Sequence, residues 1–401
     1  MNQNAEWAQR ANRSLVGNYK PQPIAIERGE GCLLFDADGR EYLDLMGGIA
    51  TTALGHCHPR IVAALEEQSH RLWHASNLFF TEPQVKLAEG LIAHSFADRV
   101  FFCNSGAEAN EAALKLARRF HRDRGEDRFE IIAFDRSFHG RTLFTVSATG
   151  NPAYWKGFEP LVPGIRFAPF GDLGAVKELL SERTAAIIVE PIQGEGGVRP
   201  APAGFLEGLR ELADENGALL IFDEVQSGMG RTGKLFGYQH SSVTPDLMTL
   251  AKALGNGIPI GALCASEPYA GALIPGTHAS TFGGNPLATT CGEVVLDELT
   301  AGGLVERGRI AGKHLASGLA AIAQAFPEQV VETRGLGLLR GLELTGPAAA
   351  IIERCQELGV LVIPAGANVI RFAPALIIEN DQIDAGLKVV AQALAEAKGE
   401  S

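Results

Sequence analysis

The sequence predicts an α/β protein with a mainly parallel central sheet, helices on both faces of that sheet, and a smaller α+β region after it. The first observation behind this prediction is a series of apolar runs: RVFFCN, EIIAFD, GIRFAPF, AAIIVEPI, ALLIFDEV, LMTLA and GALCAS. The second is that helical patterns such as EANEAALKLARRFH and AGFLEGLRELADENG lie between most of these runs. Continuous apolar strands that alternate with helices are typical of parallel sheets buried on both faces.

The two ends of the chain predict different elements. Residues 1–53 are expected to form an arm of short strands that belongs to the small domain, with a hairpin in GCLLFDADGREYLDL that turns at Asp36 to Gly39. A helix is predicted in RIVAALEEQSHRL, after His58-Pro59. Residues 54–300 are predicted as the large domain. Residues 301–401, with the runs LGLLRGLEL, VLVIPAG and NVIRFAP between helical patterns, are predicted as a C-terminal small domain.

The composition narrows the classes of function. The chain has 401 residues, 46% of them hydrophobic, and a formal net charge of −12 at pH 7. An acidic surface argues against nucleic acid or an anionic membrane as the main partner. The six cysteines include no C-x-x-C pair, which favours a reducing compartment. The N-terminus lacks the apolar core of a signal peptide, and no apolar run is long enough to span a bilayer, so we expect a cytoplasmic protein.

Ligands of such sheets bind beyond the carboxyl ends of the strands, so the residues after each apolar run are the functional candidates. In CNSGAEANEAALKLA a strand ends in small residues and a helix begins. Ser105, Gly106 and Ala107 leave backbone N–H groups accessible at a helix N-terminus, where the helix dipole favours a phosphate. The same stretch also fits an ordinary N-cap, with Ser105 as the cap and Glu108 completing a capping box.

Two further candidates follow successive apolar runs. Asp223 ends the run in ALLIFDEV, and Lys252 follows LMTLA. A buried lysine has a lowered pKa and a nucleophilic amine, as Schiff-base formation needs, although a lysine that reaches solvent is the alternative. If the two strands are neighbours, the lysine, the carboxylate and the phosphate site surround one small ligand. This set of groups matches pyridoxal phosphate (PLP), whose protonated ring nitrogen pairs with an acidic side chain.

Two other motifs predict turns rather than sites. GMGRTG, from Gly228 to Gly233, fits the G-x-G-x-x-G pattern of a nicotinamide-dependent oxidoreductase. That pattern needs a helix to follow at once, because the helix N-terminus binds the pyrophosphate, whereas KLFGYQHSSVTP is a poor helix former. His56, Cys57 and His58 suggest a metal site, but adjacent ligands rarely converge on one ion, so we expect no metal and a turn before a helix.

Nine motifs are spread over nearly the whole chain, and their order and spacing together are specific: LGHCHP, SNLFFTEP, NSGAEANEAALKLAR, FHGRT, EPIQGEGG, FDEVQSGMGRTG, TLAKALGNGIPIGA, STFGGNPLA and IRFAPAL. In these motifs the chain resembles the class III PLP-dependent aminotransferases of the aspartate-aminotransferase (type I) fold. The resemblance implies that Lys252 holds PLP as a Schiff base and moves the reaction proton, while Asp223 pairs with the ring nitrogen. It also implies a PLP site made up of Ser105, Gly106, Ala107, Phe138, Glu224, Val225 and Gln226.

The same resemblance implies a homodimer with shared sites and two arginines that bind substrate. Thr281 would bind the phosphate of the neighbouring subunit's PLP. Arg141 would hold the α-carboxylate of an N-acylated ornithine near Ser280, and Arg371 that of glutamate or 2-oxoglutarate. A guanidinium suits both tasks because its planar fork binds carboxylates bidentately. Glu195 would act as a gate that pairs with Arg371 when the bound substrate lacks that carboxylate.

The reaction implied by the resemblance is transamination of N2-acetylornithine with 2-oxoglutarate, a step of arginine biosynthesis. Its products are N-acetylglutamate 5-semialdehyde and glutamate. Succinylornithine, succinyl-diaminopimelate, ornithine and 4-aminobutyrate remain open as amino donors, because several of them also carry a distal carboxylate. Outside this chemistry, the nicotinamide-dependent oxidoreductase and a non-catalytic binding protein on the same fold remain as alternatives.

Overall fold

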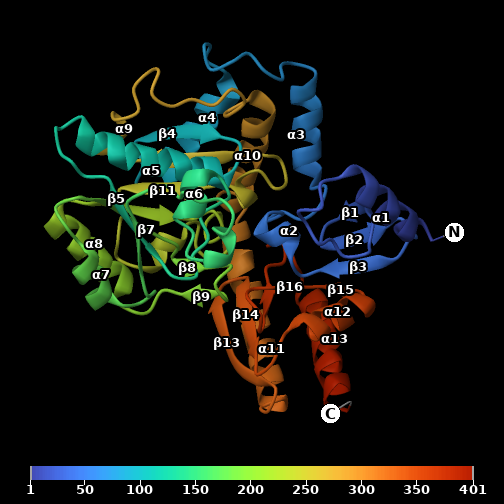
Figure 1. The fold of residues 1–401 in the computed structure, drawn as a ribbon. Helices are drawn as coiled ribbons and strands as arrows, with labels where there is room; N and C mark the ends of the chain where they lie inside the picture. The colour runs from blue at the N-terminus through green and yellow to red at the C-terminus, as the bar shows by residue number, and fades with distance from the viewer. Residues whose placement is uncertain (1, 400–401) are drawn as a thin grey trace.

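A computed structural model describes residues 2–399, and its central element is a seven-stranded sheet with the strand order β4-β12-β11-β10-β7-β5-β6 (Figure 1). In chain order the strands are β4 (Arg99–Cys103), β5 (Glu130–Phe134), β6 (Ile165–Ala168), β7 (Thr184–Val189), β10 (Leu219–Asp223), β11 (Leu247–Leu250) and β12 (Gly261–Ala265). Each of them coincides with one of the predicted apolar runs, and only β7 begins one residue before its run. Five neighbouring strands of the sheet, β6, β5, β7, β10 and β11, pair in parallel, so the prediction of a mainly parallel sheet is confirmed.

One strand of this sheet departs from strand–helix alternation. β12 is antiparallel to both of its neighbours, β11 and β4. Between β11 and β12 the chain forms only a short 3₁₀ turn, η3 (Lys252–Leu254). A parallel return needs a crossover of a dozen or more residues, whereas an antiparallel return can be short, so the connection decides the direction of β12.

Alternating side chains of the strands bury both faces of the sheet. On β5, Ile131 and Ala133 pack in the cluster that includes α5 (Gly106–Arg122). Ile132 and Phe134 point the other way and pack with α7 (Leu173–Leu179) and α8 (Phe205–Asn216). Figure 1 shows α5 on one side of the sheet and α7 and α8 on the other. This two-residue period gives a rigid platform for groups at the strand ends.

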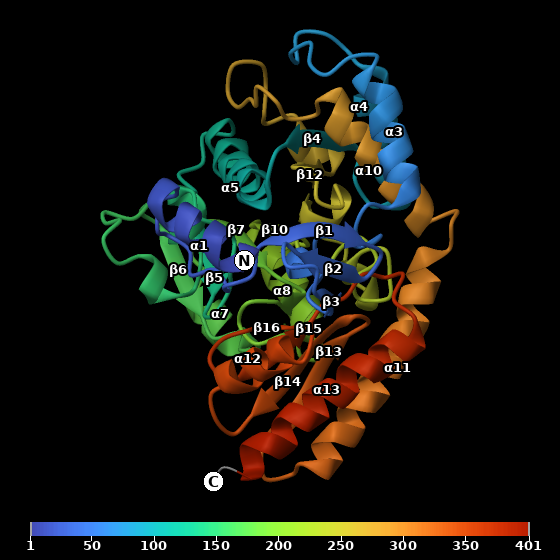
Figure 2. The same ribbon diagram turned by 90° about the vertical axis from the view of Figure 1, so that its right-hand side faces the viewer.

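Further helices flank the β4 edge of the sheet. α10 (Pro286–Leu299) packs against α3 (Pro59–Ser69) and α4 (Glu82–His94), and the three lie together in Figure 2. The predicted helix after His58 is therefore confirmed as α3. Among residues 2–399, none of the helices combines the length and the apolar character that a membrane span requires.

The N-terminal strands join a strand from the last part of the chain. β1 (Ile26–Glu30), β2 (Leu33–Asp36) and β3 (Glu41–Asp44) pair antiparallel, which confirms the predicted hairpin. β15 (Val360–Leu361) adds to β3 in parallel, with Val360 opposite Leu43. Residues far apart in the sequence thus share one small sheet.

The C-terminal part is a smaller α+β layer, as predicted. Its sheet has the order β13-β14-β17-β16, formed by β13 (Val330–Leu336), β14 (Leu339–Leu344), β16 (Ile363–Pro364) and β17 (Val369–Phe372). Its helices are α11 (Leu304–Ala325), α12 (Ala349–Glu357) and α13 (Asn380–Gly399), and α11 packs against α13 (Figure 2). The remaining short elements are α1 (Gln3–Ser14), α2 (Gly47–Ala50), α6 (Leu143–Ser147), η1 (Pro152–Tyr154), β8 (Ile192–Gln193), β9 (Arg199–Pro200), η2 (Gly237–His240) and α9 (Glu267–Ala270).

Candidate active site

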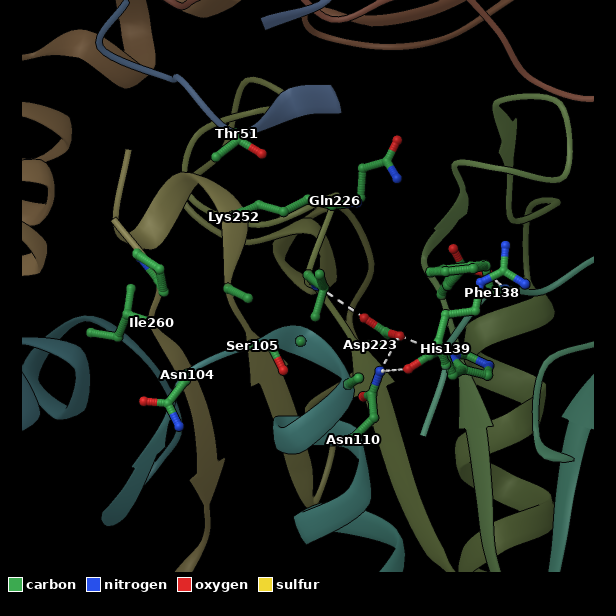
Figure 3. A pocket seen from close by; sticks show the side chains of 18 of the residues that line it. Thr51, Asn104, Ser105, Asn110, Phe138, His139, Asp223, Gln226, Lys252 and Ile260 are labelled. Atoms are coloured by element: carbon green, nitrogen blue, oxygen red, sulfur yellow. Dashed lines mark hydrogen bonds and ion pairs between the residues drawn. The ribbon is translucent and has the colours of Figure 1, made fainter. Parts of the chain in front are cut away.

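A cavity of about 350 Å³ lies at the carboxyl ends of the parallel strands. The residues that line it come from segments that follow four different apolar runs of the sequence. Nine of the predicted site residues line it: Ser105, Gly106, Ala107, Phe138, Arg141, Asp223, Val225, Gln226 and Lys252. In Figure 3, Lys252 and Gln226 lie at the top, Ser105 to the left and Phe138 to the right of Asp223. We call this space the active-site cavity.

Lys252 enters the cavity from the turn that follows β11. Its backbone φ is 44°, in the left-handed region that side-chain-bearing residues avoid. Such strain costs of the order of 1–3 kcal/mol and collects at functional sites, where the surrounding structure enforces it. Burial of the amine lowers the pKa of Lys252 below its usual value of 10.5, although Glu195 and Asp223 act in the opposite direction. Lys252 is therefore partly buried at the position that the sequence predicts, and its role as a nucleophile stays a prediction.

Asp223 ends β10, beside β11, with Thr249 opposite it in the register. Its carboxylate is only 4% exposed. It accepts hydrogen bonds from Nδ1 of His139 at 2.7 Å, from Nδ2 of Asn110 at 2.7 Å and from the Val225 amide at 3.0 Å. Three donors hold the carboxylate in one orientation towards the cavity (Figure 3).

Two residues of this arrangement were not predicted from the sequence. Asn110 accepts a hydrogen bond from the Thr249 hydroxyl at 2.7 Å and donates to the His139 carbonyl at 2.8 Å. Asn110 and His139 thereby position Asp223. A signal existed for both: Asn110 is a polar residue on the alanine-rich buried face of α5, and His139 lies inside the FHGRT motif.

The N-terminus of α5 opens onto the cavity. The Ser105 hydroxyl accepts the Glu108 amide at 3.2 Å, and the Glu108 carboxylate accepts the Asn104 amide at 2.6 Å. The predicted N-cap at Ser105 is thus confirmed, whereas Glu108 binds the amide of Asn104 and not that of Ser105, so the expected capping box is not completed. Gly106 and Ala107 of the first turn line the cavity. A Cβ on Gly106 would lie 2.7 Å from Cγ1 of Val225, so only glycine fits at this position. The cap and the anion cradle are compatible functions of one helix end.

The two arginines predicted to bind substrate differ in their partners. Arg371, which is 2% exposed, binds Glu195 through two hydrogen bonds of 2.6 and 3.3 Å and donates to Oε1 of Gln226 at 2.9 Å. Burial alone would raise the pKa of Glu195, but the charge and hydrogen bonds of Arg371 outweigh burial and hold that pKa below its usual value. The guanidinium of Arg141 lies 3.6 Å from the ring centre of Tyr154 and has no carboxylate partner among the described residues.

Glu190 ties the loops of the site together. Its carboxylate accepts the Phe138 amide at 3.1 Å and the Gly194 amide at 3.3 Å. Burial, followed by the charge of Asp223, raises the pKa of Glu190 well above its usual value. The loop that carries Phe138 and the loop that carries Glu195 are therefore held by one buried side chain.

Five predicted residues do not line this cavity within the single chain: Glu195 and Arg371, which pair with each other, and Glu224, Ser280 and Thr281. The carboxylate of Glu224 binds the amides of Gly237 and Tyr238, and burial raises its pKa to about 7. This side chain does not line the cavity, and a contact of Glu224 with the cofactor stays a prediction. The Ser280 hydroxyl accepts hydrogen bonds from Asn104 at 3.1 Å and from the Gly283 amide at 2.9 Å. Thr281 is exposed and lines a separate hollow, so its expected contact with a neighbouring subunit's cofactor stays a prediction.

The motif GMGRTG and the stretch from His56 to His58 form turns, as predicted. After GMGRTG the chain continues through turns into η2, so no helix N-terminus is available there for a pyrophosphate. Arg231 of this motif is buried and donates to the carbonyl oxygens of Leu338 and Pro374. Nε2 of His56 lies 2.8 Å from Asp44, and α3 begins directly after His58. Within residues 2–399 no group of three or more potential ligands gathers around a metal position.

The donor set of the cavity fits PLP. A desolvated lysine, a fixed carboxylate and a helix N-terminus supply one group for the aldehyde, one for the ring nitrogen and one for the phosphate. Val225 and Phe138 both line the space between these groups, where a flat ring would lie. The positions that would hold the cofactor are therefore Lys252, Asp223 and the first turn of α5.

Known proteins share both the sequence and the fold. The family model for class-III aminotransferases matches residues 16–394. An acetylornithine aminotransferase of Myxococcus xanthus is 52% identical over 378 residues, 94% of each chain. A succinylornithine transaminase of Salmonella paratyphi A is 50% identical over 388 residues, 93% of this chain and 92% of the relative. A solved structure of the ornithine aminotransferase of Toxoplasma gondii, with PLP partly occupying its active site, is 32% identical with a TM-score of 0.95 and covers 99% of this chain and 95% of that one.

These likenesses extend over nearly the full length of the chain and agree with the lysine, the carboxylate and the helix N-terminus of the active-site cavity. The chain belongs to the class-III aminotransferases, a family of PLP-dependent enzymes.

Proposed function

We propose that this aminotransferase transfers the terminal amine of N2-acetylornithine to 2-oxoglutarate, which gives N-acetylglutamate 5-semialdehyde and glutamate, a step of arginine biosynthesis. The observation that carries the proposal is a pair of arginines in different environments. Arg141 lines the active-site cavity and has no carboxylate partner among the described residues, whereas Arg371 lies behind Gln226 of that cavity and is neutralised by Glu195. The similarity to the acetylornithine aminotransferase of Myxococcus xanthus supports the same donor.

The chain's own residues divide the work at the reacting carbon. When bound, PLP supplies an electron sink that stabilises negative charge on the carbon next to the transferred amine. Asp223 keeps the ring nitrogen protonated, which strengthens that sink, and His139 and Asn110 keep Asp223 in place. Lys252 takes the proton from the substrate carbon and delivers it to the cofactor. Its lowered pKa leaves the amine neutral, and so able to act as this base, over a wider range of pH than for a lysine in water.

The Glu195–Arg371 pair distinguishes the two half-reactions. The reacting end of acetylornithine is an amine without a neighbouring carboxylate, so Arg371 keeps Glu195 as its counter-charge. 2-Oxoglutarate brings a carboxylate next to its reacting carbon, and this carboxylate replaces Glu195 on Arg371. Arg141 holds the other carboxylate of either substrate. Leaving a buried arginine without a counter-charge costs free energy, because the charge is removed from water. The exchange keeps Arg371 neutralised with either substrate bound.

We also propose a homodimer, with Thr281 at the partner's PLP phosphate, in the cytoplasm. Large apolar side chains are exposed on the segment 72–80 and on the loop around Phe282, including Phe80 at 97%, Trp73 at 63% and Phe282 at 61%. Exposed apolar patches of this kind mark contact surfaces. Covering this surface with a second copy would place both segments at the subunit contact.

The test is the visible absorption of the purified holoenzyme during successive additions of the two substrates. N2-acetylornithine should bleach the band of the lysine-bound cofactor, and 2-oxoglutarate should restore it. Lys252→Ala is the control, which should bind both substrates and show neither change. Parallel additions of succinylornithine, succinyl-diaminopimelate, ornithine and 4-aminobutyrate rank the donors by kcat/KM. Bleaching by 4-aminobutyrate or ornithine but not by acetylornithine would overturn the proposed donor.

A further inference from the structure

A second cavity adjoins the active site on the other side of Phe138. It has a volume of about 560 Å³ and is lined by three arginines from distant parts of the chain: Arg136 before α6, Arg199 on β9 and Arg334 on β13. Phe138 lines both cavities, and Glu195 lines this second one. We call it the arginine cavity. The transamination described above does not use the charges of these three arginines.

Two of the arginines are only partly satisfied. Arg334, whose side chain is 9% exposed, pairs with Glu332 and Glu343 and donates from Nε to the Gly197 carbonyl at 2.7 Å. Its Nη2 is buried and makes no hydrogen bond within the described chain. Arg199 lies 3.6 Å from Glu343, and its Nε is likewise buried without a partner. The carboxylates of Glu332 and Glu343 therefore do not accept all the N–H groups of Arg199 and Arg334.

Arg136 adds a third positive charge without a counter-charge. Its side chain is exposed and has no hydrogen-bond or ion-pair partner among residues 2–399. The nearby carboxylates are already in use, since Glu343 and Glu332 bind Arg334 and Glu195 binds Arg371. Three guanidinium groups against two carboxylates leave one positive charge, which favours an anion in the arginine cavity.

The position of Arg141 connects this cavity to the proposed substrate. The Arg141 guanidinium stacks on the ring of Tyr154, and Tyr154 lines the arginine cavity. In an N2-acylated ornithine the α-carboxylate and the acylated nitrogen are bonded to the same carbon. If Arg141 binds the α-carboxylate, the acyl group therefore begins beside Tyr154, at the boundary between the two cavities.

We propose that the arginine cavity is the acyl subsite and that Arg136, with Arg199 and Arg334, binds an acyl group that ends in a carboxylate. This inference rests on the proposed function, because it assumes an N2-acylated ornithine on Arg141. It predicts that the chain accepts succinyl-type donors in addition to acetylornithine, and that Arg136 contributes to the binding of the succinyl-type donors alone. The two acyl groups differ by one carboxylate, which the arginine cavity recognises by its unmatched charge.

The experiment compares N2-succinylornithine with N2-acetylornithine as donors for the wild-type holoenzyme and for Arg136→Asn. Asparagine removes the charge and tolerates the left-handed backbone at this position, where φ is 64°. Arg136→Lys restores a positive charge. Arg183→Asn is the matched control, because Arg183 is an exposed arginine just before β7, at the amino end of that strand, whereas the active-site cavity lies at the carboxyl ends. The 2-oxoglutarate half-reaction is measured separately for each protein.

We expect Arg136→Asn to lower kcat/KM for succinylornithine by about 5- to 30-fold, the range expected for a partly exposed charge-assisted hydrogen bond. The values for acetylornithine and 2-oxoglutarate should change less than twofold, Arg136→Lys should recover part of the loss, and Arg183→Asn should have no effect. Equal losses for both donors, a loss confined to 2-oxoglutarate, or no loss would overturn the acyl subsite while leaving the proposed function intact. Turnover of neither acylated donor by the wild type would overturn the proposed function itself.

Discussion

Lys252 shows how burial prepares a single side chain for catalysis. Its amine lies in the active-site cavity, where removal from water disfavours the protonated form. A lowered pKa leaves the amine neutral, and hence nucleophilic, over a wider range of pH than for a lysine in water. The neighbouring Glu195 and Asp223 limit this effect, because negative charge favours the protonated amine.

The first prediction concerns the pH dependence of cofactor capture by the apoprotein. The amine is protonated below its pKa and neutral above it, and this pKa lies below the usual 10.5. We expect the rate of covalent PLP capture to rise with pH and to reach its half-maximum below 10.5. The reaction of PLP with N-acetyl-lysine in solution is the reference. A half-maximum at the same pH as the reference would show that Lys252 is not desolvated.

The second prediction concerns the charge of Asp223. In Asp223→Asn the ring nitrogen loses its charged partner, which is worth about 1.5–3 kcal/mol, or a 10- to 150-fold loss of kcat. The new amide group would face the donors of Asn110 and His139, so the free energy of unfolding should also fall, by about 1–3 kcal/mol. Steady-state kinetics and denaturant unfolding measure the two effects.

A cofactor analogue separates these two effects of Asp223→Asn. PLP methylated at the ring nitrogen carries a permanent positive charge and does not need the carboxylate to keep it. It should restore much of the turnover of the variant without changing its stability. Full activity of Asp223→Asn with ordinary PLP would contradict the role of Asp223.

At the scale of elements, the N-terminus of α5 is fitted to the strand end beside it. Gly106 begins the helix and faces Val225, which follows β10. The Ser105 hydroxyl accepts only the Glu108 amide, which leaves the amides of Gly106 and Ala107 for an anion. The phosphate site therefore depends on the packing between a helix end and a loop, as well as on the motif.

The third prediction tests this packing. In Gly106→Ala the new Cβ would lie 2.7 Å from Cγ1 of Val225, so the helix end or the valine must move. Overpacking costs about 1–3 kcal/mol, and we expect the Kd for PLP to rise by about 5- to 100-fold. Gly346→Ala is the matched control, because open space surrounds its Cβ position. Adding Val225→Ala to Gly106→Ala should recover part of the affinity, and additive losses in the double variant would rule out the proposed clash.

At the scale of the whole molecule, distant segments meet at each functional position. β15 pairs with β3, and the arginine cavity takes residues from before α6, from β9 and from β13. The division into residues 1–53, 54–300 and 301–401 stays a prediction. The contact of β3 with β15 supports the grouping of the N-terminal strands with the C-terminal region.

The fourth prediction tests whether active sites are shared between subunits. A mixed dimer of Lys252→Ala and Thr281→Ala subunits contains one site in which the lysine and the partner's threonine are both intact. We expect it to show about half of the wild-type activity per dimer, whereas Lys252→Ala dimers are inactive and Thr281→Ala dimers bind PLP weakly. If Thr281 served its own subunit, neither site would be complete, and mixing would produce no gain over the parent variants.

Much of the site could be predicted from the sequence because its motifs are local. Asp223 and Lys252 each follow a buried strand, and Ser105 to Ala107 form a helix start within one short stretch. Glu224 could not be placed in this way. It is adjacent to Asp223 in the sequence, but the backbone after β10 turns its carboxylate towards the amides of Gly237 and Tyr238.

The sequence by itself determined the alternation of strands and helices, the helix cap and the positions of Lys252 and Asp223 at strand ends, because hydrophobic period and turn chemistry act over a few residues. Only the tertiary structure decided that β12 runs antiparallel, that Asn110 and His139 hold Asp223, and that three arginines share a cavity beside Phe138. Those features depend on the length of a connection and on the packing of segments far apart in the chain. Long-range contacts of this kind leave no periodic pattern in the sequence.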